Sequence, residues 1–249
     1  MGLRALVTRP QADAKELCDL LQERGVAPVL APLLTIVPKP HMVPDLDRVQ
    51  AIVFTSANGA RALAAILPAD GPAFDLPAFC VGDQSARAAR DLGFSKVESA
   101  GGDVADLAEL IKSRLDPGAG PLYHAAGSKV AGDLSGLLEG AGFALRRQAL
   151  YEAHKAESLP GPAALALAAG DLDLALFFSP RTAAAFVRLV AQEEFGGACR
   201  NVTAYALSGA VADILKEIPW RKISVAPRPE MDSLLVVLDA DLAEGNLTQ

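Results

Sequence analysis

The chain of 249 residues contains few cysteines, and these are scattered. Cys18, Cys80 and Cys199 lie far apart, and no C-x-x-C pair occurs. An odd number of distant cysteines predicts free thiols in a reducing compartment. Apolar runs are also short, because none reaches the roughly 18 residues of a membrane span, and the N-terminus enters a strand pattern without a signal peptide. We therefore expect a cytoplasmic protein that does not bind a membrane.

Standard catalytic and cofactor motifs are missing as well. The sequence has no G-x-S-x-G, H-E-x-x-H or G-x-x-x-x-G-K motif, and no G-x-G-x-x-G follows the first predicted strand. The three histidines, His41, His124 and His154, lack the spacing of metal ligands, and His124 is expected to be a structural residue inside a strand. These absences predict no metal and no cofactor, and they leave no obvious nucleophile.

Aromatic residues make up only 5% of the sequence, whereas hydrophobic residues make up 51%. Since Ala, Leu and Val supply most of the hydrophobic content, we expect helices packed on a buried parallel sheet. The net charge of −7 disfavours nucleic-acid binding, which depends on neutralising phosphates. An anionic ligand would instead need the backbone N–H groups at helix N-termini.

Short apolar runs alternate with longer amphipathic stretches along the whole chain. Arg4–Thr8 favours a strand, and Asp13–Arg24 favours a helix that Gly25 ends. This alternation predicts an α/β fold with parallel sheets covered by helices on both faces. The other predicted strands are 50–54, 78–81, 96–98, 122–125, 174–178, 202–207 and 222–225. The other predicted helices are 58–67, 84–92, 104–114, 134–139, 182–193, 210–216 and 231–240. Residues 27–37 and 143–153 are expected to be extended.

The sequence also contains an internal repeat. Leu6–Pro10 aligns with Tyr123–Gly127, and Val53–Ser56 aligns with Leu176–Ser179. The chain therefore has two copies of one plan, and each copy consists of four units, A, B, C and D, in chain order. The A unit is the first strand and helix of a copy with the extended segment that follows, which ends near residue 38 in the first copy and near residue 154 in the second. We expect a ligand cleft between the copies. The residues alone allow two packings. Either each copy forms its own lobe, or the two A units are exchanged.

The turns after the predicted strands carry small and hydroxyl side chains. Ligands of doubly wound sheets bind at such turns, where hydroxyl and N–H groups can hold carboxylates or phosphates. The same side chains can simply cap the following helices. The candidate ligand-binding residues are Thr8, Arg9, Thr55, Ser56, Asn58, Ser85, Gly127, Ser128, Ser179, Arg181 and Ser208, with Lys129 as a further positive charge. Tyr151, at the end of the second extended segment, is either a packing residue or a proton donor.

Five short motifs, in order along the chain, resemble those of the uroporphyrinogen-III synthase family. They are Val7–Pro10, Phe54–Asn58, Val81–Ala86, Ala149–Glu152 and Phe177–Pro180, and the likeness covers nearly the whole chain. One departure is the turn at Ser208, where the family often has glycine, so this resemblance supports ligand contacts from that turn less strongly.

The resemblance implies a particular arrangement of the copies. The fold would be two flavodoxin-like lobes with parallel sheets, internally duplicated and joined by a two-stranded connector, with the A units exchanged. Residues 1–36 and 155–249 would form lobe 1, residues 42–149 would form lobe 2, and residues 37–41 and 150–154 would form the connector strands and hinge.

The resemblance also implies an activity. A member of this family is a lyase, typically monomeric, that cyclises hydroxymethylbilane to uroporphyrinogen III in tetrapyrrole biosynthesis, with inversion of ring D, loss of water and no cofactor. Tyr151 would donate the proton to the leaving hydroxyl, and Thr55, Ser56, Ser85 and Ser179 would line the cleft. A transient contact with hydroxymethylbilane synthase is also expected. The alternatives are a non-catalytic two-lobed module that binds small anions, and a two-lobed glycosyl or phosphosugar enzyme.

Overall fold

A computed structural model describes residues 2–39, 41–129 and 132–247. The chain forms two compact units: Met1–Thr35 with His154–Gln249 make up unit 1, and Ile36–Ala153 makes up unit 2. Residues 1, 40, 130–131 and 248–249, which fall within the predicted lobes and connector, lie outside the described residues.

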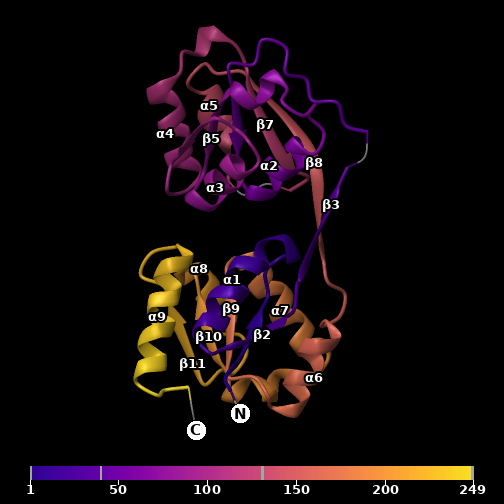
Figure 1. Ribbon diagram of the computed structural model, residues 1–249, viewed down its shortest axis with the longest axis vertical. Helices are drawn as coiled ribbons and strands as arrows, with labels where there is room; N and C mark the ends of the chain where they lie inside the picture. Colours follow the sequence, from indigo (N-terminus) through magenta and orange to yellow (C-terminus); the bar gives the residue numbers. More distant parts are fainter. Residues whose placement is uncertain (1, 40, 130–131, 248–249) are drawn as a thin grey trace. The chain divides into compact units, whose positions relative to one another are not determined.

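Unit 1 contains a parallel sheet of five strands that come from both ends of the sequence. The strand order is β11-β10-β9-β1-β2, and every pair of neighbours is parallel. Figure 1 shows the indigo strands of the N-terminal segment beside the strands of the C-terminal half. The strands are β1 (Arg4–Val7), β2 (Ala27–Leu30), β9 (Leu174–Phe177), β10 (Thr203–Ala206) and β11 (Lys222–Val225).

Helices cover both faces of the unit 1 sheet. One face, with Leu6 and Phe177, packs against α6 (Gly161–Ala169), α7 (Pro180–Gln192) and α8 (Gly209–Leu215). The other face, with Val7 and Tyr205, packs against α1 (Gln11–Glu23) and α9 (Met231–Ala243). A 3-10 helix, η3 (Phe195–Asn201), precedes β10. Because β1 contributes to both cores, it is a central strand buried on two sides.

Unit 2 repeats this design with strands from the middle of the chain. Its six-stranded sheet has the order β3-β8-β7-β4-β5-β6, in which β8 to β6 are parallel neighbours. The strands are β3 (Leu34–Pro38), β4 (Ala51–Phe54), β5 (Pro77–Cys80), β6 (Lys96–Ser99), β7 (Leu122–Gly127) and β8 (Leu145–Lys155).

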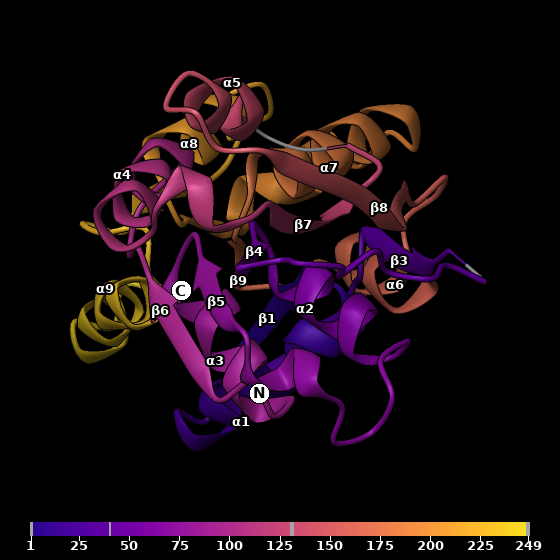
Figure 2. The same ribbon diagram turned by 90° about the horizontal axis from the view of Figure 1, so that it is seen from above.

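Two pairs of helices cover the unit 2 sheet. Ile52 and Phe54 face α2 (Ala57–Ala64) and α3 (Asp83–Asp91), whereas Ala51 and Val53 face α4 (Val104–Arg114) and α5 (Leu134–Glu139). Figure 2 shows the two pairs on opposite sides of this sheet. Two 3-10 helices, η1 (Pro72–Asp75) and η2 (Pro117–Ala119), complete the unit. The predicted α/β class with helices on both faces is confirmed.

The two sheets have the same order once the repeat is taken into account. In each sheet the order is extended segment, A strand, B, C and D, which is the 2-1-3-4-5 order of flavodoxin-like folds. Each sheet, however, combines the A strand of one copy with the B, C and D strands of the other. Of the two packings that the residues allow, the structure has the one in which A units are exchanged.

The expected extended segment 27–37 is divided into two strands. β2 pairs with β1 in unit 1, whereas β3 pairs with β8 in unit 2. Lys39 donates its backbone N–H to Leu150, and Ala156 donates to Leu33, so β3 and β8 run antiparallel. The chain passes between the units twice, through β3 and through β8.

Several helix boundaries differ from the predicted ones because capping residues set them. The helix expected at 182–193 begins at Pro180, with Ser179 as its N-cap, since proline suits the first helical position. The helix expected at 58–67 is α2, capped by Ser56, and it ends at Ala64. Among the described residues, no helix is both long enough and apolar enough to cross a membrane.

Candidate functional site

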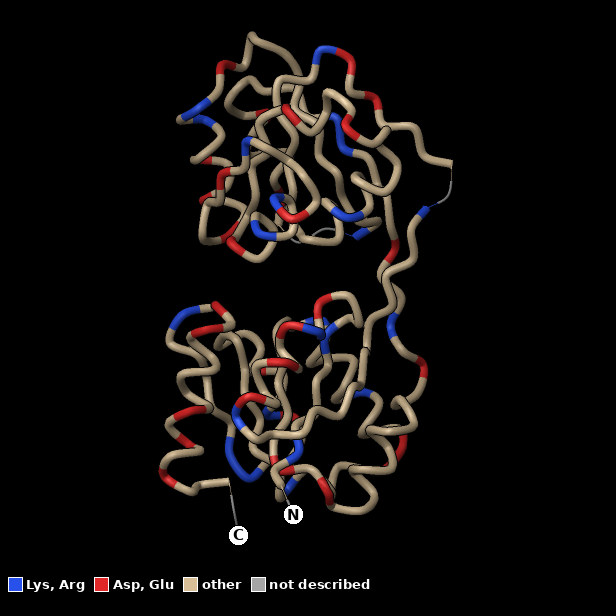
Figure 3. The backbone as a smooth tube through the Cα atoms, in the orientation of Figure 1, with Lys and Arg blue, Asp and Glu red and all other residues tan. Residues whose placement is uncertain are grey.

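The predicted site residues lie at the carboxyl edges of the two sheets. Because parallel strands all end at the same edge, the turns after β4, β5 and β7 meet in unit 2, and those after β1, β9 and β10 meet in unit 1. Acidic and basic residues are interspersed along both units (Figure 3). Charge alone therefore does not mark either edge as an anion site.

Tyr151 and Ser56 form a hydrogen bond at the carboxyl edge of unit 2. The Ser56 Oγ lies 2.8 Å from the Tyr151 hydroxyl, and either group can be the donor. Ser56 is also the N-cap of α2, since its Oγ accepts the Gly59 N–H at 3.4 Å. A serine oxygen has two lone pairs and one proton, so it can accept from Gly59 while it donates to Tyr151.

The backbone of β7 holds the Tyr151 ring in place. Tyr151 was expected at the end of an extended segment. It lies within β8 instead, because this strand continues to Lys155. A bulge places Tyr151 opposite Gly127, and a Cβ at position 127 would lie 2.9 Å from ring atoms of Tyr151. Gly127 therefore acts by leaving room for the ring. The Tyr151 side chain is only 9% exposed.

Thr55 faces the opposite side of the sheet and bonds to His124. Side chains of a strand alternate between faces, so Thr55 continues the α4/α5 face of β4, whereas Ser56 continues the α2/α3 face. His124 is on the same face in β7, and its Nε2 lies 3.0 Å from the Thr55 Oγ1. Burial, followed by the charge of Arg147, lowers the pKa of His124 to about 4, so the ring is neutral at pH 7.

The remaining predicted residues of unit 2 lie near the ends of the same strands. Asn58 accepts a hydrogen bond from Arg61 through its Oδ1 at 2.9 Å, and Ser85 is buried near the start of α3. The Ser128 N–H and Oγ both donate to the Tyr151 carbonyl, at 2.9 and 3.2 Å. Ser128 therefore joins the end of β7 to β8 beside Tyr151. The neighbouring Lys129 is exposed.

In unit 1, Ser179 and Ser208 occupy equivalent N-cap positions but differ in their bonds. The Ser179 Oγ accepts the Thr182 N–H at 3.1 Å and also contacts the Thr182 hydroxyl. Ser208 precedes α8 without a capping bond from its side chain. Arg181 is partly buried in the first turn of α7. The capping role that the sequence allowed is thus observed for Ser179.

Thr8 and Arg9 are more buried than surface ligand-binding residues would be. The Thr8 side chain is fully buried, and its Oγ1 donates to the Leu176 carbonyl at 2.8 Å, which ties β1 to β9. The Arg9 guanidinium lies 4.5 Å from the centre of the Phe178 ring, in the geometry of a cation–π contact. Arg9 is 6% exposed. The structure therefore places Thr8 inside the sheet and Arg9 against the turn that precedes α7.

Two residues of the unit 2 edge were not among the predicted site residues. His124 was expected to be structural, yet it contacts Thr55, and Arg147 donates to the carbonyl of Gly127 at 2.7 Å. The signal that would find His124 is the alternation of β4 and β7, which places Thr55 and His124 on one face. Arg147 had no signal, because it pairs with His124 only through the register of β7 and β8.

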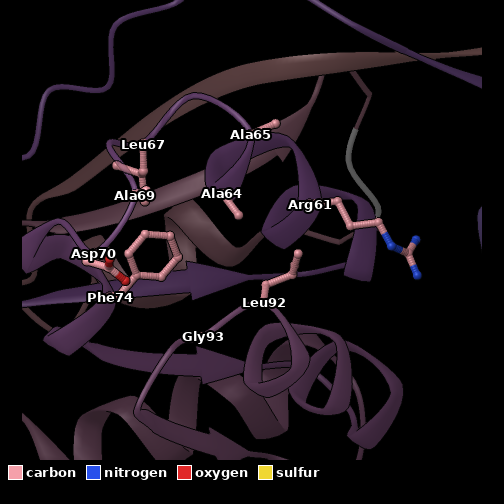
Figure 4. A pocket seen from close by; sticks show the side chains of 9 residues that line it. All are labelled: Arg61, Ala64, Ala65, Leu67, Ala69, Asp70, Phe74, Leu92 and Gly93. Carbon is pink, nitrogen blue, oxygen red and sulfur yellow. The ribbon is translucent and has the colours of Figure 1, made fainter.

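One pocket of unit 2 lies away from this edge. A helix that follows a strand runs back along the sheet, so the C-terminal ends of α2 and α3 lie at its amino edge. The pocket there has a volume of about 490 Å³. Figure 4 shows its mostly apolar lining, with Arg61 extending away from the other side chains. None of the predicted site residues lines it.

The described residues show neither a metal-binding cluster nor an activated thiol. They contain no group of three or more His, Cys, Asp and Glu side chains able to hold a metal ion. Burial raises the pKa of Cys80 to about 12, and it does the same for Cys199. These thiols are therefore protonated at neutral pH and are not nucleophiles. The polar groups at the edge of unit 2 are hydroxyls, backbone amides, the His124 ring and the Arg147 guanidinium.

Fold and site together define a class: a duplicated doubly wound α/β protein with exchanged A units and hydroxyl-rich strand ends. The sequence profile described as uroporphyrinogen-III synthase HemD matches residues 15–236. The chain therefore belongs to the uroporphyrinogen-III synthase family, whose members are lyases of porphyrin biosynthesis. The family predicted from the motifs is confirmed, and membership supports this activity over a non-catalytic anion-binding module or a glycosyl enzyme.

Solved structures support the fold. The uroporphyrinogen-III synthetase of Helicobacter pylori is 20% identical, with a TM-score of 0.64 over 96% of this chain and 99% of that one. A mutant uroporphyrinogen III synthase of the extremely thermophilic bacterium Thermus thermophilus is 21% identical, with a TM-score of 0.54 over 97% and 99%. At such identities the likeness concerns the fold alone. A search of curated proteins finds no match.

Proposed function

We propose that this protein converts hydroxymethylbilane, a linear tetrapyrrole with many carboxylates, into uroporphyrinogen III, with inversion of ring D and loss of water. Family membership supports the reaction. The observation in the structure that carries the proposal is the Tyr151 hydroxyl, which is held by Ser56 at the carboxyl edge of a doubly wound sheet. That edge is where ligands of such folds bind.

Tyr151 is the proposed proton donor. As the C–O bond of the hydroxymethyl group breaks, the pyrrole ring supplies the electron pair, and the leaving hydroxyl takes the Tyr151 proton and departs as water. When the Ser56 hydroxyl donates to the Tyr151 oxygen, the Tyr151 proton is free to point to the substrate, and the resulting phenolate keeps one hydrogen bond. The azafulvenium cation that remains, which keeps its pyrrole N–H proton, then closes through a spiro species, and no cofactor takes part.

The carboxyl edges are proposed to bind the carboxylates of the substrate. The helices α2, α3 and α7 begin there, and their first N–H groups and partial positive charge favour anions in a chain with a net charge of −7. Holding the intermediate in one geometry would select the closure that inverts ring D. The proposed contacts are Thr8, Arg9, Thr55, Ser56, Asn58, Ser85, Gly127, Ser128, Ser179, Arg181 and Ser208; those of Thr8 would come from its backbone, because its side chain is fully buried.

Three further parts of the proposal concern the whole protein. Residues 37–41 and 150–154 would act as a hinge, since the chain passes between units 1 and 2 through β3 and β8. A cytoplasmic location is supported by the three free cysteines. A transient contact with hydroxymethylbilane synthase would protect a substrate that also closes spontaneously.

Product analysis tests the proposal. The protein is incubated with freshly generated hydroxymethylbilane, the products are oxidised, and the porphyrin isomers are separated. We expect isomer III in excess over a control without protein. If isomer I alone forms, as in spontaneous closure, the protein is not the synthase.

A further inference from the structure

His124 has a buried ring nitrogen with no hydrogen-bond partner in the part of the chain that the structure describes. Its side chain is 2% exposed, and its Nε2 lies 3.0 Å from the Thr55 Oγ1. Its Nδ1 is buried and has no hydrogen-bond partner among the described residues. A buried polar atom without a partner costs on the order of 1–3 kcal/mol, so this arrangement calls for a physical reason.

The histidine lines a small cavity of about 60 Å³. About 10–15 Å³ of such volume is enough to hold a water molecule, so the cavity has room for at least one. Thr55 lines the same cavity, and the charged residues that line it are Asp133 and Arg147. The ring therefore shares this cavity with one acidic and one basic side chain.

These neighbours decide which nitrogen of the neutral ring carries the proton. Asp133 would favour a proton on Nδ1 if its carboxylate accepted that proton, but Nδ1 has no hydrogen-bond partner among the described residues. The Asp133 Oδ1 instead caps α5 by accepting the Gly136 N–H at 2.9 Å. Burial is the larger cause of the lowered pKa of His124, and the positive charge of Arg147 is the second cause. A positive charge beside the cavity favours a lone pair on Nδ1 and hence a proton on Nε2.

The proton on Nε2 in turn determines the direction of the Thr55 hydroxyl. If Nε2 donates, the Thr55 Oγ1 is the acceptor and its own proton is free to point away from the sheet. If Nε2 accepts, the Thr55 proton is held by the ring and only an oxygen lone pair remains for a ligand. An anion needs the first arrangement, because a carboxylate only accepts hydrogen bonds.

We propose that His124 is a positioning residue, which donates from Nε2 to Thr55 and thereby presents the Thr55 hydroxyl as a donor to a carboxylate of the substrate. This inference rests on the proposed function, because it takes Thr55 as a substrate contact. His124 itself touches no reacting atom.

The tautomer can be measured on the protein as it is. Proton–nitrogen correlation spectra of ¹⁵N-histidine show which ring nitrogen is protonated, and the chain has three histidines. His41 and His154 are exposed, so substituting each by Asn assigns their signals without disturbing the core. We expect His124 to be protonated on Nε2 at pH 7. Protonation on Nδ1 overturns the proposal whatever the activity of the protein.

Kinetics test the consequence for binding. Glutamine places an amide near Nε2 and asparagine places one near Nδ1, so His124→Gln can still donate to Thr55, whereas His124→Asn cannot. Because a contact to a substrate carboxylate is made before and during the reaction, we expect KM to rise about tenfold in His124→Asn with little change in kcat. His124→Gln should retain most of the wild-type KM.

A double-mutant cycle separates positioning from structure. If His124 acts through Thr55, His124→Asn should leave KM nearly unchanged in a Thr55→Val background. The inference is contradicted if His124→Asn raises KM equally in the wild-type and Thr55→Val backgrounds. It is also contradicted if lost thermal stability alone accounts for the lost activity. A wild-type protein that forms no isomer III contradicts the proposed function instead, and the tautomer measurement is independent of that result.

Discussion

The side chain of Tyr151 and that of Ser56 meet although 95 residues separate them in the sequence. At the scale of single residues, the alternation of β4 explains why Ser56 meets Tyr151 and the adjacent Thr55 meets His124. The two hydroxyl groups of one turn therefore belong to different faces and have different partners. A substitution at either position should affect its own hydrogen bond and leave the other in place.

The Tyr151 hydroxyl gives the first prediction. Tyr151→Phe removes the proposed acid while the ring remains between Ser56 and Gly127. We expect kcat for formation of isomer III to fall on the order of 10²-fold, the lower end of the contribution of a general acid, because the substrate also loses water without help. The fall should be measured by isomer analysis after short incubations.

Tyr123→Phe is the matched control. Tyr123 is a buried tyrosine of β7 whose hydroxyl donates to Gln148, so the substitution also removes one buried hydroxyl from the same sheet. It should leave kcat close to wild type. A Tyr151→Phe variant with full kcat, or a similar loss in both variants, contradicts the role of Tyr151.

At the scale of elements, the helix N-termini show how one serine can serve two purposes. Ser56 and Ser179 both cap the helices that follow them, yet a capping oxygen retains a proton for another partner. The capping role and the proposed binding role are therefore compatible. Ser208, which has no capping bond from its side chain, provides the natural comparison.

Replacing the two unit 1 serines by alanine should affect stability differently. Ser179→Ala removes the bond to the Thr182 N–H and should lower the free energy of unfolding by about 1 kcal/mol. Ser208→Ala should change it by less than about 0.5 kcal/mol. Urea unfolding of both variants measures the difference, and equal losses would show that the capping geometry does not control stability here.

A buried carboxylate holds α9 against the unit 1 sheet. Asp241 is 4% exposed and accepts hydrogen bonds from Tyr205 at 2.7 Å and Lys222 at 2.8 Å. Burial alone would raise the pKa of Asp241, but the bonds from Lys222, Tyr205 and Asn246 outweigh it and lower the pKa below its usual value. The charged form is therefore favoured in the folded protein.

Asp241→Asn should weaken this attachment in a manner that depends on pH. Loss of hydrogen bonds to a charged group should cost about 1.5–3 kcal/mol at pH 7. Because the folded pKa is depressed, the contribution of Asp241 is present above the unfolded value near 4 and is lost as pH falls through the lower folded value. Urea unfolding at pH 7 and near pH 3 should therefore show a gap between variant and wild type that narrows at low pH. A gap that does not change with pH contradicts this assignment.

At the scale of the whole molecule, the exchange of A units makes one unit continuous and the other discontinuous in sequence. Unit 2 is the single segment Ile36–Ala153, whereas unit 1 needs β1 and β2 from the N-terminal end. Ala5, Leu6 and Val7 are fully buried, and they belong to the cores on both faces of the unit 1 sheet. Unit 1 without these strands would lack the centre of both cores.

Fragments test this difference. Residues 36–153 expressed alone should unfold cooperatively in urea, and residues 154–249 alone should not, because β9 would expose an unpaired edge and two open cores. Co-expression of residues 1–35 with 154–249 should restore a cooperative transition.

Fragments cut at the repeat boundary are the control. Residues 1–116 and 117–249 each contain one complete copy of the repeat, yet neither contains a complete sheet. Both should fail to unfold cooperatively. A stable 1–116 fragment would show that the repeat itself, rather than the exchanged arrangement, is the folding unit.

Much of the fold and part of the site could be predicted from particular segments. The apolar run at 50–54 and the amphipathic stretch at 13–24 are local patterns, so β4 and α1 were predicted close to where they lie. The turn residues Thr55 and Ser179 were found at the strand ends for the same reason. Their hydrogen bonds to His124 and Thr182 were not predicted, because a bond across strands or within a cap depends on register and side-chain direction.

The sequence by itself determined the alternation of strands and helices, the duplication and the hydroxyl-rich turns, since each is a pattern of neighbouring residues. Only the tertiary structure decided which A strand completes which sheet. The two copies have similar apolar patterns, so either A strand could pair with either set of B, C and D strands as far as periodicity is concerned. The hydrogen bonds of β1 to β9 and of β7 to β4 make that choice, and β7 thereby brings His124 to Thr55.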